Sequence, residues 1–173
     1  MRRVRLSNKE VKELARSLGK AGELLKDADV VEVAEIEGGR ALYIVDSQPA
    51  LLKAQIAGLG EAIMPSLYLI HKTQLGQKAI SLYPSVVVDA GAVKHILNGA
   101  DVMRPGIKGI EGDFNKGDPV LILDEKKRVV AVGIALYDKK ELESMERGKV
   151  IYNAHYLGDK IWKLSIELVK EKS

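Results

Sequence analysis

Cysteine is absent from this chain of 173 residues. Disulfide bonds, thiolate metal sites and cysteine nucleophiles are therefore excluded. Aromatic residues make up only 5% of the sequence, so Val, Ile, Leu and Ala must build most of the core. No stretch approaches the roughly 18 apolar residues of a membrane-spanning helix, and the start of the chain lacks the apolar run of a signal peptide. These absences lead us to expect a cytoplasmic protein.

The chain also lacks a large excess of either positive or negative charge. The chain has 27 Lys and Arg against 24 Asp and Glu, a net charge of +3. Residues 1–84 hold 12 basic and 10 acidic side chains, and residues 85–173 hold 15 and 14. Nucleic-acid binding needs clustered positive charge. Any such contact must therefore come from a local patch; the alternative is a solvated surface of mixed charge that favours solubility.

The first half of the sequence predicts a small α+β unit. Ser7 and Glu10 have the spacing of a capping box, which predicts a helix over residues 8–18. Gly38 and Gly39 allow the positive φ angles of a tight hairpin turn between two β-rich runs. Residues 65–71 favour a short helix because Pro suits a first helical turn, and residues 76–83 are expected to be a connector. The predicted strands are residues 30–36, 41–45, 50–56 and 61–64.

From Ser85 the pattern changes to a βαβ start followed by mostly antiparallel strands. Helices are predicted over residues 91–97 and 138–145. A last strand pair is predicted across Gly158 and Asp159. This order argues for a closed or nearly closed barrel with helices at its ends. We expect two domains, residues 1–84 and 85–173. The predicted strands of the second are residues 85–88, 100–103, 119–123, 129–136, 150–157 and 161–166.

One long segment, Val87 to Ile107, resembles the opening of a PUA domain, an RNA-binding module named for pseudouridine synthases and archaeosine transglycosylases. Gly117 to Val120 and Val132 to Ala135 are similar to its later part. The resemblance covers Ser85 to about Lys163. It implies a β pseudobarrel with helices at its ends.

Two further segments narrow this resemblance. Pro65 to Lys72 and Asn153 to Trp162 resemble the family of the protein amplified in T-cell malignancy, to which ligatin is related. That family places a small α/β pre-PUA domain before the PUA domain, and its archaeal members are short chains. The resemblance implies an RNA-binding translation factor in initiation or recycling. Its partners would be rRNA or tRNA, the small ribosomal subunit and a separate translation factor, and it would need no cofactor.

The resemblance also implies which residues face RNA. In PUA domains the first helix, the following Pro-Gly turn and the strand after the second helix form that surface. Carried over to this sequence, it points to Gly91, Lys94, Arg104, Pro105, Gly106, Lys149 and Tyr152.

Four of these residues have both a functional and a structural interpretation. Gly91 and Gly106 allow an RNA backbone to come close, but Gly91 also suits a tight strand–helix turn, and Gly106 a type II turn with positive φ. Lys94 supplies charge for phosphate or is a solvated helix residue, and Tyr152 stacks on an unpaired base or belongs to the core. Our hypothesis is that Arg104→Glu with Lys94→Glu weakens RNA binding and leaves the fold intact.

Catalytic and metal sites are not indicated. The three histidines lack metal-ligand spacing, and none of the glycine-rich segments has the pattern of a phosphate-binding loop. The 84 residues before the PUA segment are too few for a typical RNA-modifying catalytic domain. Two non-enzymatic alternatives stay open beside the translation factor. One is an accessory subunit that delivers RNA to a modification or processing enzyme, and the other is a protein-interaction module.

Overall fold

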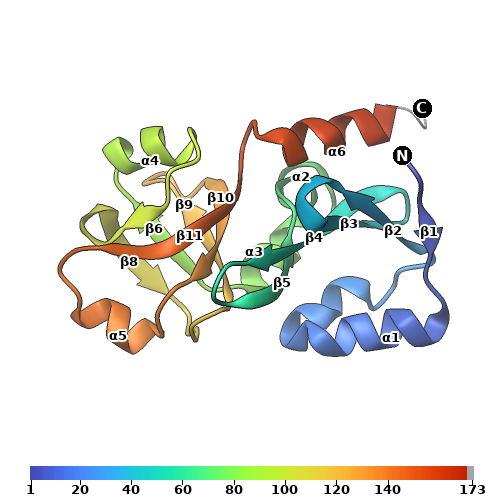
Figure 1. Ribbon diagram of the computed structural model, residues 1–173, viewed down its shortest axis with the longest axis horizontal. Helices are drawn as coiled ribbons and strands as arrows, with labels where there is room; N and C mark the ends of the chain where they lie inside the picture. Colours follow the sequence, from blue (N-terminus) through green and yellow to red (C-terminus); the bar gives the residue numbers. More distant parts are fainter. Residues whose placement is uncertain (171–173) are drawn as a thin grey trace. The chain divides into compact units, whose positions relative to one another are not determined.

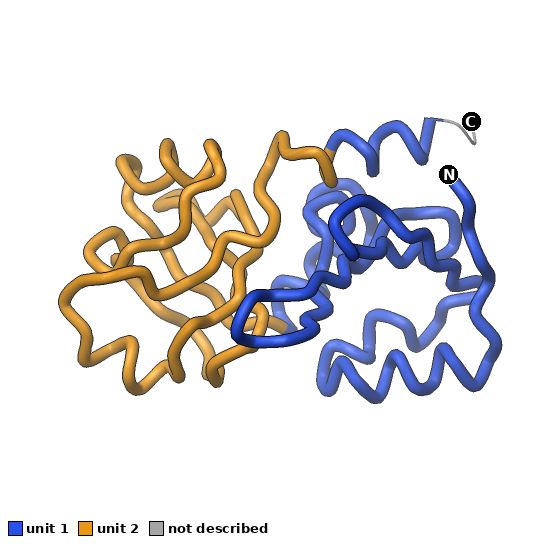
Figure 2. The backbone as a smooth tube through the Cα atoms, viewed as in Figure 1, with its two compact units in different colours: residues 1–82, 163–173 blue, residues 83–162 orange. Residues whose placement is uncertain are grey.

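The chain folds into two compact units in a computed structural model that describes residues 1–170. Unit 1 comprises residues 1–82 together with those from Lys163 onward, and unit 2 comprises residues 83–162 (Figure 2). The chain therefore passes between the units twice, after Leu82 and after Trp162. This arrangement differs from the expected division into residues 1–84 and 85–173, because the C-terminal residues group with the first unit.

Unit 1 is built on a five-stranded antiparallel sheet whose strands follow one another in sequence order, from β1 to β5. The four predicted strands are confirmed. Gly38 and Gly39 adopt φ angles of 77° and 71° in the turn between β2 and β3, as expected for a tight connection. The short β1, which adds an edge strand, was not predicted. The strands are β1 (Val4–Arg5), β2 (Val31–Ile36), β3 (Arg40–Val45), β4 (Gln48–Ile56) and β5 (Gly60–Pro65).

The helices of unit 1 begin at identifiable caps. At the start of α1 the Ser7 amide donates to Glu10 Oε1 at 2.9 Å and the Glu10 amide donates to Ser7 Oγ at 3.1 Å, which confirms the capping box. The expected connector over residues 76–83 is wrong, because it forms helix α3. Its buried positions are the small Gly76 and Ala79, so no apolar stripe marked it. The helices are α1 (Asn8–Ser17), the 3-10 helix η1 (Gly19–Leu25), α2 (Leu67–Lys72) and α3 (Gly76–Leu82).

Unit 2 contains a curled sheet (Figure 1). Its six strands lie in the order β7-β11-β10-β9-β6-β8. Only β6 and β9 run parallel, and the other neighbours are antiparallel. The two end strands, β7 and β8, are joined by a single turn of three residues, η3, so the sheet must bend round to bring its ends together. The expected barrel-like fold is confirmed. The strands are β6 (Ser85–Val88), β7 (Val102–Met103), β8 (Ile107–Glu111), β9 (Pro119–Leu123), β10 (Val129–Ala135) and β11 (Lys149–Tyr156), and η3 is Arg104–Gly106.

Two short helices complete unit 2. Helix α4 (Ala90–Ile96) begins at Asp89, whose Oδ1 accepts from the Ala92 amide at 2.8 Å. Helix α5 (Lys139–Ser144) precedes β11. Both were predicted to within two residues. Across residues 1–170, no helix is long and apolar enough to cross a bilayer.

The final predicted strand, residues 161–166, is wrong, because residues 160–170 form helix α6 (Lys160–Lys170). Asp159 is the reason. Its Oδ1 accepts from the Trp162 amide at 2.9 Å, which is the bond of a helix N-cap and not of a hairpin turn. The buried residues that follow are Ile161, Ser165 and Leu168, at helical spacing. Since one of them is a serine, the apolar stripe was obscured.

Candidate functional site

A β-bulge in β11 decides which of its side chains face solvent. Lys149 and Tyr152 are three positions apart, and regular alternation would place them on opposite faces of the strand. The pairing of β11 with β7 shifts register between Lys149 and Ile151. Val150 and Ile151 are both buried as a result, whereas Lys149 and Tyr152 are both exposed. Tyr152 is therefore a surface residue, 39% exposed, and not part of the core.

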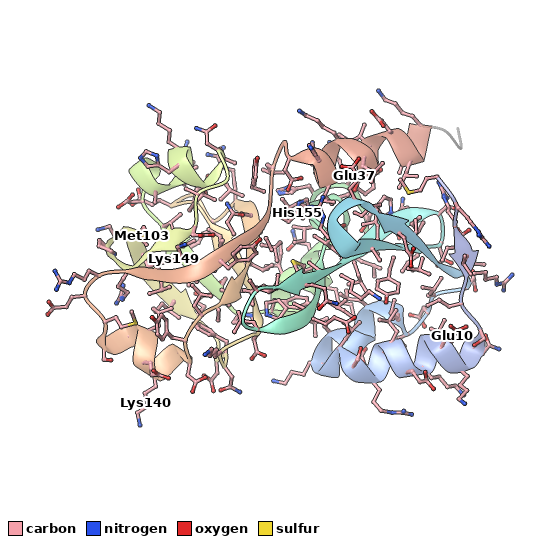
Figure 3. The ribbon with its side chains drawn as sticks, viewed as in Figure 1. Glu10, Glu37, Met103, Lys140, Lys149 and His155 are labelled. Carbon is pink, nitrogen blue, oxygen red and sulfur yellow. The ribbon has the colours of Figure 1, made fainter. Side chains whose placement is uncertain are left out.

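Met103 completes this outer face and was missed from the sequence. It lies directly across from Lys149 in the β7–β11 pair, as the labelled side chains in Figure 3 show, and it is 50% exposed. Its position at the exposed end of a two-residue strand could not be derived without knowing the strand's partner. An exposed thioether, an aromatic ring and an ammonium group together offer apolar contact area beside a positive charge.

The Arg104-Pro105-Gly106 segment forms the 3-10 turn η3 and not a type II turn. Gly106 is absent from the residues with positive φ, so that interpretation is wrong. The Arg104 amide donates to the Gly148 carbonyl at 2.8 Å, and its Nε donates to the Leu142 carbonyl at 2.9 Å. Arg104 is thus half-buried and links the end of β7 to α5 and to the residue before β11. Pro105 is exposed.

The two glycines predicted to face RNA have different surroundings. A Cβ atom on Gly106 would lie 3.0 Å from Ala92 Cβ, and the Gly106 carbonyl accepts from the Asp89 amide at 2.9 Å. Gly106 therefore allows η3 to pack against the start of α4. A Cβ atom on Gly91 would meet only Asp89 Oδ1, at 3.5 Å. Gly91 is exposed and open to solvent, so the shape of the fold does not require a glycine there.

Lys94 lies on the exposed side of α4, between two flanking turns. On one flank η3 contacts Ala92. On the other, a hollow of about 210 Å³ separates α4 from the β9–β10 turn; its lining includes Ala90, Val93 and Lys126. Because side chains advance by about 100° per residue, Lys94 points outward between these flanks. It is exposed.

The predicted residues belong to one continuous region of unit 2. Gly106 joins η3 to α4, and Arg104 joins η3 to Gly148, directly before β11. Contacts do not link Lys94 to Tyr152 directly. We call this region the α4–η3–β11 surface, defined by Gly91, Lys94, Met103, Arg104, Pro105, Gly106, Lys149 and Tyr152. Within residues 1–170, no group of three His, Cys, Asp or Glu side chains is placed to hold a metal ion.

Comparison with known proteins identifies both halves of the chain. The PUA domain family matches residues 84–157, and a domain of unknown function, DUF1947, matches residues 2–73. An uncharacterized protein of Methanocaldococcus jannaschii is 37% identical over 162 residues, which is 91% of this chain and 93% of that protein. Translation machinery-associated protein 20 of Saccharomyces cerevisiae is 31% identical over 152 residues, 84% of this chain and 78% of that protein.

A solved structure has the same two-unit fold. The crystal structure of a hypothetical protein from the hyperthermophilic archaeon Pyrococcus horikoshii superposes with a TM-score of 0.76 at 34% identity. The match covers 95% of this chain and 99% of that one, so it includes both units.

Proposed function

Because this chain, with its DUF1947 and PUA domains, belongs to the family of translation machinery-associated protein 20, we propose that it is a non-catalytic RNA-binding translation factor. It contacts the small ribosomal subunit or tRNA and acts in initiation or recycling. The name of the yeast relatives supports the link to translation, and the PUA domain supports RNA as the ligand.

The observation that carries the proposal is the composition of the α4–η3–β11 surface. Lys94 and Lys149 are exposed cations, and phosphate groups dominate the affinity of proteins for nucleic acid. Tyr152 and Met103 are the exposed apolar side chains of β11 and β7. Stacking of an unpaired base on an aromatic ring contributes roughly 1–3 kcal/mol per base. An RNA strand could place its phosphate backbone on the two lysines and stack one base on Tyr152. It would then contact both the charged and the apolar parts of the surface.

A charge reversal at Lys94 tests this proposal. Lys94→Glu is suitable because the side chain is exposed on α4, whereas Arg104 has a structural hydrogen bond. The matched control is Lys140→Glu on α5, which is exposed and lies outside the surface (Figure 3). In filter binding with tRNA at about 0.1 M salt, we expect Lys94→Glu to weaken binding roughly 5- to 20-fold more than the control. Equal effects of the two substitutions would contradict the proposal.

Sedimentation of the native protein in cell extract tests the translation role separately. Migration with the small ribosomal subunit is the expected result. Migration with an RNA-processing complex would replace the translation factor with the accessory subunit that delivers RNA to an enzyme. Absence of RNA binding even at low salt, where phosphate contacts are strongest, would favour the protein-interaction module.

A further inference from the structure

Positive charge is concentrated at the beginning of the chain, in unit 1. Among residues 1–20, seven side chains are basic and two are acidic, a net charge of +5. The whole chain carries 27 basic and 24 acidic side chains, so residues 21–173 hold 20 basic against 22 acidic ones. The entire positive excess of the protein therefore comes from its first 20 residues. The near balance over residues 1–84 conceals this cluster.

Three of these cations form a stripe along helix α1. Counted from Lys9 at about 100° per residue, Lys12 and Arg16 lie within an arc of roughly 60° on the helix surface. Leu14, the buried residue of α1, lies on the opposite side. With a rise of about 1.5 Å per residue, the stripe is about 10 Å long. Lys9, Lys12 and Arg16 are all exposed, and we call them the α1 ridge.

The acidic residues of α1 lie toward the sheet of unit 1, with Glu13 about 40° from Lys9 around the helix and Glu10 about 100° from it. Glu10 and Glu13 line a hollow of about 670 Å³ between α1 and the sheet of unit 1, whereas none of the ridge residues lines it. Glu10 is also held by the capping box with Ser7. Across residues 1–170, no ion pair within 4.0 Å involves a ridge residue. The ridge thus presents three cations to solvent, with the Glu13 carboxylate at its edge.

The placement of these cations contributes little net stability to the helix. Lys9 lies in the first turn of α1, where the helix dipole disfavours positive charge. Lys12 and Arg16 are four residues apart, a spacing at which like charges repel. Only Arg16, in the last turn, is favourably placed. Glu13, four residues after Lys9 and three before Arg16, offsets part of this repulsion. The three cations still exceed this one carboxylate, so a net positive charge faces solvent and is available to an external anionic partner.

We infer that the α1 ridge is a second RNA-binding surface, which contacts the phosphate backbone and gives the DUF1947 domain a direct part in RNA recognition. The inference rests on the proposed function of the chain as an RNA-binding protein. Three cations within about 10 Å act together, because this is about one Debye length at 0.1 M salt. Their contact would be independent of sequence, since point charges on phosphate carry no base information.

RNA fits this ridge better than a membrane surface does. A helix that lies in a bilayer interface needs an exposed apolar face opposite its cations. The apolar side of α1 is already used, because Leu14 is buried and Val11 and Ala15 are half-buried in unit 1. The solvent-facing side of α1 offers charge without apolar area.

The test compares two triple variants of the full chain that lose the same charge. The ridge variant is Lys9→Gln, Lys12→Gln and Arg16→Gln, with glutamine chosen because it is a good helix former. The control is Lys26→Gln, Lys140→Gln and Lys163→Gln, three exposed and scattered positions. The probe is unfractionated tRNA in filter binding over a salt series. Loss of three phosphate contacts should weaken binding roughly 10-fold at 0.1 M salt and reduce the slope of log K against log salt by about 2.

The possible outcomes separate this inference from the proposed function. If the native chain binds neither tRNA nor the small subunit, the proposed function fails and the ridge inference fails with it. If Lys94→Glu weakens binding but the ridge variant matches its scattered control, only the ridge inference is overturned. Loss of binding to phosphatidylserine vesicles with unchanged tRNA binding would make the ridge a membrane contact and would also overturn it. Circular dichroism should show the ridge variant to be as helical as the native chain.

Discussion

Lys149 forms an ion pair with Asp101 at the rim of the α4–η3–β11 surface, with Nζ 3.0 Å from Oδ2. The other oxygen of Asp101 accepts a hydrogen bond from the backbone amide of Asn153 at 2.7 Å. The lysine side chain is 56% exposed and the aspartate only 19%. Asp101 is thus fixed by β11, while Lys149 is free to swing toward a second anion. In the proposed complex, RNA phosphate competes with Asp101 for this ammonium group.

Replacing Asp101 with asparagine should therefore strengthen RNA binding. Asp101→Asn keeps an oxygen that accepts from the Asn153 amide and removes the charge that neutralises Lys149. We expect tRNA affinity to rise about 2- to 5-fold at 0.1 M salt. The stability change should stay below about 1 kcal/mol, because the lysine end of the pair is exposed and asparagine keeps the hydrogen bond from the Asn153 backbone amide. A fall in affinity without unfolding would show that Lys149 does not contact RNA.

Alanine substitutions at Gly91 and Gly106 should have different effects on protein stability and on RNA binding. Gly91→Ala meets no steric obstacle and should stabilise the protein by roughly 0.5 kcal/mol, because alanine is the better helix former. If RNA passes close to Gly91, the same change should weaken tRNA binding. Gly106→Ala places a methyl group 3.0 Å from Ala92 Cβ and should destabilise by about 1 kcal/mol. Urea unfolding and filter binding measure the two effects; tighter RNA binding by Gly91→Ala would remove Gly91 from the RNA surface.

Substitution of Arg104 should affect stability even where its charge is kept. Arg104→Lys retains the positive charge but loses the Nε donor to the Leu142 carbonyl. We expect a loss of about 1 kcal/mol in the free energy of unfolding, as is typical of one hydrogen bond. Arg104→Glu loses the same donor and should also lower stability, so Lys94→Glu alone is the cleaner test of RNA binding. Unaltered thermal unfolding of Arg104→Lys would show that this bond is dispensable.

Asp159 should make the stability of the protein sensitive to acid. Burial raises the pKa of its carboxyl group, but the hydrogen bond and charge of His155 and the amides of Trp162 and Tyr156 outweigh this, so the pKa is lowered overall. A lowered pKa means that the carboxylate contributes fully above the pKa of an unfolded aspartate, about 3.9. This contribution is lost as the pH falls from there through the folded-state pKa.

The matched variant for this prediction is Asp159→Asn. It should lower the urea midpoint at pH 7, because the charged cap of α6 and the partner of His155 are weakened. It should also flatten the decline in stability below about pH 4 relative to the native chain. Parallel declines for the two proteins would assign the acid sensitivity to other carboxyl groups.

Most strands of both units could be predicted from the sequence because their signals are local, whereas β1 and β8 were missed. The Gly38-Gly39 turn and the capping box at Ser7 each depend on neighbours a few residues away. Helices α3 and α6 were missed because small or polar residues occupy buried positions, Ala79 in one and Ser165 in the other. In such helices the packing partner decides the structure, and that partner is distant in sequence.

The candidate site was less predictable than the fold for a related reason. Its residues came from resemblance to PUA domains, and their exposure depends on pairing between β7 and β11. The register shift after Lys149 is a property of two strands that lie almost 50 residues apart, so inspection of β11 alone could not reveal it. Met103 was missed for the same reason. The α1 ridge, by contrast, can be read from helical spacing once α1 is recognised.

The double passage of the chain between the units has a consequence for which unit can fold without the other. Unit 2 is one continuous segment, residues 83–162, inserted between two parts of unit 1. Helix α6, with Ser165 and Leu168 buried, follows unit 2 in the sequence. Unit 2 therefore has all of its residues in one uninterrupted stretch, whereas unit 1 needs segments from both sides of it. A purified chain truncated after residue 162 should keep unit 2 resistant to protease while unit 1 becomes susceptible.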